Sequence, residues 1–173
     1  MGSIDMIESH EDHPYNLISR SQFISEYSEI TKNKICWQIG CYLGSMLYID
    51  MGRKVAYTTK LHKRNVEKGT DIIGVRDCYW EIYHDDELII DAWTDNNIIK
   101  EKIRCLINKQ FVNVIIDDNW IEFSFSDNYK LICDFTNQNE VEDQEDSILQ
   151  LTCENGNEYE ISVFGNIEKH TLN

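Results

Sequence analysis

The sequence contains no apolar run of the roughly 18 residues that a membrane-spanning helix requires, and its single proline is Pro14. The first sixteen residues have neither the basic region nor the apolar centre of a signal peptide. We therefore expect a cytoplasmic protein without a membrane partner. No CxxC pair is present either, so we expect six reduced thiols rather than disulfides. The cysteines are Cys36, Cys41, Cys78, Cys105, Cys133 and Cys153.

The common catalytic signatures are also missing. No glycine-rich nucleotide loop, HExxH or GxSxG motif occurs, and no acidic run has the spacing of a calcium loop. His10 and His13 have a ligand-like spacing, but they lie in a polar lead that offers no scaffold. The pairs Asp85-Asp86 and Asp117-Asp118 fall where turns are expected, and aspartate at a turn bonds its own backbone. We expect no catalytic residue, no metal and no cofactor.

Negative charge is abundant and unevenly distributed. The chain has 31 acidic and 16 basic residues, for a net charge of −15. Such a chain repels nucleic acid, whose binding requires lysine and arginine, and attracts a basic protein. Residues 117–173 carry fourteen acids against Lys130 and Lys169 only, whereas residues 53–70 carry six basic residues against Glu67. The acidic part is therefore the expected face for a basic partner.

The length of 173 residues fits one ordinary domain. We expect a loose lead over residues 1–16 and a single domain over residues 17–173. Apolar spacing predicts a helix over residues 22–30, capped by Ser19 or Ser21, and a second over residues 97–107, capped by Thr94 or Asp95.

Most of the remaining sequence has the period-2 alternation of half-buried strands. Residues 120–125 show it most clearly, and Asn155-Gly156 is a strong hairpin signal. Residues 53–70 are interpreted as a strand followed by a loop, and residues 137–146 as a surface loop. The expected strands cover residues 36–39, 45–51, 72–83, 88–93, 111–116, 120–125, 129–135, 148–153 and 158–164, with Gly52 ending the second.

Sequential hairpins with few helices predict an α+β fold dominated by strands. We expect a largely antiparallel sheet, either packed on one or two helices or curled into a half-barrel. The four tryptophans lie in or beside predicted strands, and we expect them to be in the core: Trp37, Trp80, Trp93 and Trp120.

Several segments together resemble a family of small bacterial proteins encoded beside polymorphic toxins, including the immunity proteins of contact-dependent growth inhibition systems. The resemblance spans about residues 35–164 and rests on the positions of hydrophobic residues and glycines along the chain. At Trp80-Glu81 this chain departs from the Trp-Arg of the family pattern. The matching segments are Ile39-Gly40, residues 44–52, Lys68-Gly69, residues 79–82, Leu88-Ile89-Ile90 with Trp93, residues 121–131 and residues 151–156.

The resemblance implies a stoichiometric inhibitor that binds the C-terminal toxin domain encoded by its own locus, commonly a nuclease. Two alternatives remain: an enzyme or small-ligand protein with a pocket in a curved sheet, and a binding module for another partner. For the first function the expected contacts are Asp85, Asp86, Asp117, Asp118, Glu122, Asp127, Glu140, Glu142 and Asp143. If these acids do not bind, Arg53, Lys60 and Arg64 of the basic segment are the next residues to test.

Overall fold

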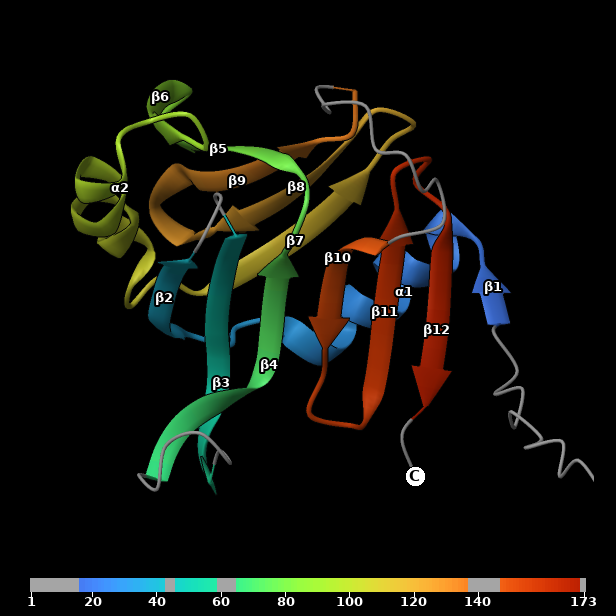
Figure 1. Cartoon of the computed structure of the whole chain (residues 1–173). Helices are drawn as coiled ribbons and strands as arrows, with labels where there is room; N and C mark the ends of the chain where they lie inside the picture. Colours follow the sequence, from blue (N-terminus) through green and yellow to red (C-terminus); the bar gives the residue numbers. More distant parts are fainter. Residues whose placement is uncertain (1–15, 43–45, 59–64, 137–146, 172–173) are drawn as a thin grey trace, which may run out of the picture.

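Two antiparallel sheets and two short helices make up the fold, which is α+β and dominated by strands, as the sequence predicts (Figure 1). The computed structural model describes residues 16–42, 46–58, 65–136 and 147–171. Among the described strands there is no closed barrel. No described helix is long and apolar enough to cross a membrane.

The larger sheet has seven strands in the order β1-β12-β11-β10-β4-β3-β2, and each pair of neighbours is antiparallel. It contains strands from both ends of the described chain, because β1 pairs with β12. Their bounds are β1 (Asn16–Ile18), β2 (Cys36–Tyr42), β3 (Met46–Thr58), β4 (Asn65–Val75), β10 (Ser147–Thr152), β11 (Asn157–Ser162) and β12 (Ile167–Thr171). The long β3–β4 hairpin projects beyond the rest of the sheet at the bottom of Figure 1.

The smaller sheet has five antiparallel strands in the order β6-β5-β9-β8-β7. Tight turns join β5 to β6, β7 to β8 and β8 to β9, so the sheet is built from local hairpins. The bounds are β5 (Tyr79–His84), β6 (Glu87–Asp91), β7 (Phe111–Ile116), β8 (Trp120–Phe125) and β9 (Tyr129–Asp134).

Both helices begin at the side-chain caps that the sequence suggests. The Ser19 hydroxyl accepts a hydrogen bond from the backbone of Gln22 at the start of α1 (Arg20–Thr31). The Asp95 carboxylate accepts one from the backbone of Asn97 at the start of α2 (Asn96–Lys102), which continues as a 3₁₀ turn over Ile103–Leu106. Helix α1 packs against β7 and lies behind the larger sheet in Figure 1.

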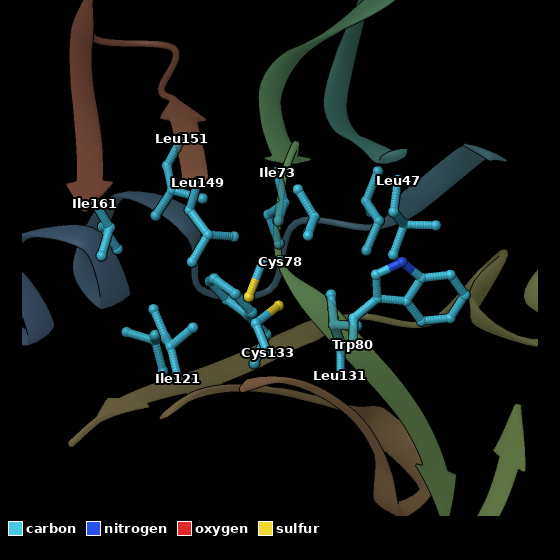
Figure 2. Packing of buried hydrophobic residues seen from close by; sticks show 14 of the residues in the cluster. Leu47, Ile73, Cys78, Trp80, Ile121, Leu131, Cys133, Leu149, Leu151 and Ile161 are labelled. Atoms are coloured by element: carbon cyan, nitrogen blue, oxygen red, sulfur yellow. The ribbon is translucent and has the colours of Figure 1, made fainter. Parts of the chain in front are cut away.

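The inner faces of the two sheets share one hydrophobic core (Figure 2). Leu47, Ile73 and Leu149 come from the larger sheet, and Trp80 and Leu131 come from the smaller one. All five are fully buried. Because side chains alternate along a strand, the residues between them point to the outer face of each sheet.

Several predicted boundaries are wrong. The single strand expected over residues 72–83 is two strands in different sheets, β4 and β5. Gly52 does not end a strand: it has a φ of 76° at a bulge, and β3 continues to Thr58. The basic segment is therefore a long hairpin in its described part, not a strand and a loop. A further strand, β12, lies beyond the last expected strand, and Asn16 of the expected lead begins β1.

Some expectations lie outside the described residues. These are the lead up to residue 15, the basic residues Lys60 and Arg64, and the surface loop over residues 137–146. Of the four tryptophans expected in the core, only Trp80 is fully buried, whereas Trp93 is 72% exposed. Trp37 and Trp120 are half-buried.

All six cysteines are free thiols in the structure, and four of them are buried. Burial raises the pKa of Cys36 to about 12 and that of Cys153 to about 12, because the core disfavours a thiolate. We expect Cys41 and Cys105, which are half-buried, to react with Ellman's reagent at least about tenfold faster than the buried four. A time course with mass-spectrometric mapping measures this. Early modification of Cys36 or Cys153 in the native protein would contradict it.

Candidate functional site

The six expected contact residues that the structure describes all belong to the five-stranded sheet or its turns. Asp85 and Asp86 form the β5–β6 turn, and Asp127 lies in the adjoining β8–β9 turn. The two turns are bonded, since the Asn128 side chain donates to Asp85 at 2.9 Å. Asp117 and Asp118 lie in the β7–β8 turn, at the opposite end of β8, and Glu122 lies between the two ends on that strand. Glu140, Glu142 and Asp143 lie outside the described residues.

Three of these acids already form ion pairs within the chain. Asp86 pairs with Lys130 at 3.0 Å, Asp127 with Lys109 at 2.6 Å and Asp118 with Arg20 at 2.6 Å. Lys109 lowers the pKa of Asp127 through the hydrogen bond between them. All three carboxylates are largely exposed, and exposed pairs stabilise a fold little. A cation of a binding partner can therefore share or replace the internal one.

A regular row of residues crosses the centre of the outer face of the five-stranded sheet. Of these residues, the sequence prediction included only Glu122. Strand register places Asp91 opposite Glu81, Glu81 opposite Ile132, Ile132 opposite Glu122 and Glu122 opposite Ile115. The row crosses all five strands and alternates between carboxylates and isoleucines after Asp91. We call these five residues the central row. Negatively charged and apolar side chains are thus interspersed along one continuous row.

Glu81 is held in place by two tyrosines of its own strand. The hydroxyls of Tyr79 and Tyr83 donate to its two oxygens at 3.1 and 2.7 Å. The hydrogen bond to Glu81, together with burial, raises the pKa of Tyr83 to about 12. For Tyr79, burial and then the same carboxylate raise the pKa. Both tyrosines therefore stay protonated at neutral pH and fix the orientation of the Glu81 carboxylate.

Trp93 is the most exposed large apolar side chain beside this row. Its ring lies 4.6 Å from that of Tyr79, centroid to centroid, and the side chain is 72% exposed. The turn that carries it is fixed, because the Asp91 carboxylate accepts hydrogen bonds from the Trp93 backbone at 2.9 Å and from the Thr94 hydroxyl at 3.0 Å. Leu88 and Ile115 are also exposed, and Leu88 is the strand partner of Tyr83. Exposed aromatic and apolar side chains grouped beside carboxylates are typical of a protein-binding surface.

Sequence reasoning missed Trp93, Glu81, Tyr79 and Tyr83 as surface residues. A usable signal was present in β5, where Trp80 and Ile82 alternate with Tyr79, Glu81 and Tyr83. If Trp80 and Ile82 face the core, the other three must face outward. For Trp93 the sequence offered no such signal, because it lies two residues beyond the end of β6.

A second feature is a groove of about 400 Å³ on the outer face of the seven-stranded sheet. Burial raises the pKa of Asp50, one of the lining residues, although its carboxylate accepts a hydrogen bond of 2.8 Å from the backbone of Gly69, which lowers it. Lys68 lies over the ring of Tyr57 at 5.4 Å. The lining residues are Gln38, Tyr42, Tyr48, Asp50, Tyr57, Val66, Glu67, Lys68, Ile72, Gln150 and Thr152.

The described cations of the basic segment already have partners. Arg53 pairs with Glu154 at 3.3 Å, and the Lys54 ammonium lies 4.8 Å from the centre of the Trp37 ring. Among the described residues one group has the composition and spacing of a metal site, formed by Glu160, Glu168 and His170 on the larger sheet. Comparison of the chain with protein-family models, curated proteins and solved structures gives no match.

Proposed function

We propose that this chain is a cytoplasmic immunity protein: a stoichiometric inhibitor that binds a basic toxin domain, commonly a nuclease, through the outer face of its five-stranded sheet. The observation that carries the proposal is the central row, in which Glu81 and Glu122 alternate with Ile132 and Ile115, next to the exposed Trp93. The residues that resemble immunity proteins of polymorphic toxin systems add to it.

The charge of the chain favours a basic partner. A nuclease binds phosphate backbones with lysine and arginine, so its cleft is basic. A protein of net charge −15 is attracted to such a cleft, and the acidic turns flanking the central row place charge at both ends of the same sheet. Complementary charge mainly speeds association and rejects wrong partners.

The exposed aromatic side chain of Trp93 is expected to supply affinity. A few well-packed aromatic anchors carry most of the binding energy of an interface, and tryptophan is enriched among them. Trp93 is held by its turn and by Tyr79, so little conformational freedom is lost when it is covered. Glu81 is likewise preorganised by two tyrosines and suits a guanidinium donor.

The test is a co-expression experiment. The C-terminal domain of an exported protein encoded beside this gene is expressed in a laboratory bacterium with and without this chain. We expect growth arrest without the chain, rescue with it, and a 1:1 complex on size-exclusion chromatography. No rescue and no complex with that domain would overturn the proposal.

Charge reversal on the sheet face gives a quantitative prediction. We expect Glu122→Lys combined with Asp127→Lys to slow association with the toxin domain by about tenfold at low salt and to flatten its salt dependence, because steering depends on these charges. The matched control is Glu29→Lys combined with Glu67→Lys, which changes the net charge equally at exposed positions on α1 and β4. Stopped-flow association at two salt concentrations distinguishes them. Equal rates and equal salt slopes for the two variants would contradict the prediction.

The groove supports a second candidate function, the binding of a small ligand. Its volume falls in the range of ligand pockets, and three tyrosines, two amides and a half-buried carboxylate converge on it. Native mass spectrometry of the purified protein tests this directly. A bound metabolite that is lost on Asp50→Asn substitution would favour this function over protein binding.

A further inference from the structure

A histidine and two glutamates converge on the outer face of β11 and β12. Glu160 and Glu168 are direct cross-strand partners, and His170 lies two residues beyond Glu168, so its side chain points to the same face. The His170 Nε2 atom is 3.9 Å from an oxygen of each glutamate, and the three candidate ligand atoms all lie within 4.8 Å of one another. This group is distant in sequence from the central row and belongs to the other sheet.

The cluster carries more negative charge than the described chain neutralises. Like charges directly opposite each other on neighbouring strands are unfavourable, yet Glu160 and Glu168 occupy such a pair. Among the described residues neither forms an ion pair with a lysine or an arginine. Lys169, between Glu168 and His170, pairs instead with Glu26 at 2.8 Å. Glu158 lies opposite His170 and adds a further acid.

We propose that Glu160, Glu168 and His170 form a binding site for a divalent transition-metal ion such as Zn²⁺. One imidazole nitrogen and two carboxylate oxygens are ligands that zinc accepts, at about 2.0–2.2 Å. Side-chain rotation alone can draw three atoms that lie within 4.8 Å of one another to that radius. The imidazole favours zinc over calcium or magnesium, which prefer oxygen ligands.

The site is supported by its position on the strands. All three side chains are partly buried, with exposures of 21% to 38%, which limits the freedom lost on binding. Both strands are hydrogen-bonded over five residue pairs, so the ligands stand on a fixed backbone. Three protein ligands leave a fourth position for water. The sequence alone did not indicate the site, because its ligands are brought together only by the pairing of β11 with β12, a strand that was not among those expected.

Isothermal titration of chelator-treated full-length protein with Zn²⁺ tests the proposal. We expect one zinc ion per chain, and at least about tenfold weaker binding for His170→Gln and for Glu168→Gln. The matched control is His84→Gln, a half-exposed histidine at the end of β5 that also lies beside a carboxylate, and it should bind as the unaltered protein does. Melting in the presence of chelator shows that each variant is folded. If His170→Gln fails this check, Glu168→Gln and Glu160→Gln decide.

Cobalt distinguishes this site from the thiols. Co²⁺ bound by nitrogen and oxygen gives weak visible bands, whereas thiolate ligation adds an intense near-ultraviolet band. We expect the first spectrum, with loss of the visible bands in His170→Gln. A thiolate band, the absence of one-to-one zinc binding, or an affinity unchanged in Glu168→Gln would each overturn the proposal and leave the three residues as a simple charge cluster.

Discussion

Replacing Phe123 with alanine is expected to destabilise the fold by about 3–5 kcal/mol, the usual cost of truncating a buried phenylalanine. Phe123 is fully buried at the centre of β8, where its strand partners are Val114 and Leu131. Its ring lies 6.3 Å from that of Tyr27 of α1, centroid to centroid. The substitution therefore leaves a cavity between the five-stranded sheet and the helix, and neither can move to fill it without breaking strand pairing.

The matched control is Ser124→Ala, the neighbouring residue on the same strand, which points to the outer face and removes little buried surface. Denaturant unfolding followed by tryptophan fluorescence measures both. A loss below about 1 kcal/mol for Phe123→Ala, or equal losses for the two variants, would mean that the alternation along β8 does not set which residues are buried.

Phe123 shows which parts of the fold are readable from sequence. Strands β8 and β9 are joined by a short turn, and their burial follows a period of two, so local pattern and structure agree. Strand β7 departs from this period at a bulge after Phe111. The run from Ile72 to Tyr83 defeats the same reasoning. Apolar residues lie on both sides of Arg76 and Asp77, and a break over residues 76–78 sends the two halves into different sheets. Periodicity reports which face of a strand is buried, but it does not report which sheet the strand joins.

The candidate surface divides in the same way. The turn positions of Asp85, Asp117 and Asp127 follow from local chemistry, because aspartate bonds its own backbone and tolerates turn geometry. That these turns share one sheet, and that Glu81 and Glu122 lie in one row, depends on pairing between strands distant in sequence. The exposure of Trp93 depends on how the chain leaves β6 and enters α2. No local pattern contains that information.

Asp71 is a buried residue that the sequence did not single out, and its removal should be equally costly. It lies in β4 with no exposed surface. One carboxylate oxygen accepts from Lys34 Nζ at 2.6 Å and from the Thr70 hydroxyl at 2.9 Å, and the other accepts from the Glu154 backbone at 3.2 Å. Burial lowers the pKa of Lys34, but its hydrogen bonds to Asp71 and Glu154 outweigh this and leave the pKa raised.

We expect Asp71→Ala to destabilise the fold by about 3–5 kcal/mol, because it removes the buried partner of Lys34 and leaves only a carboxylate that is 44% exposed. Lys34 is only 18% exposed and would keep Glu154 as its remaining carboxylate partner. The substitution also removes the side-chain hydrogen bonds that link β4 to the end of the α1–β2 connection and to the β10–β11 turn. Chemical denaturation at neutral pH gives the change in unfolding free energy.

The control for geometry is Asp118→Ala, which breaks an ion pair of the same 2.6 Å length whose carboxylate is 83% exposed. Its effect should be much smaller, since water and salt screen an exposed pair. The control for charge is Asp71→Leu combined with Lys34→Met, which removes both charges and should recover part of the loss, as apolar replacements of buried ion pairs do. If the double variant is less stable than Asp71→Ala, the cost lies in lost hydrogen bonds to Thr70 and Glu154 rather than in the partly buried ammonium of Lys34.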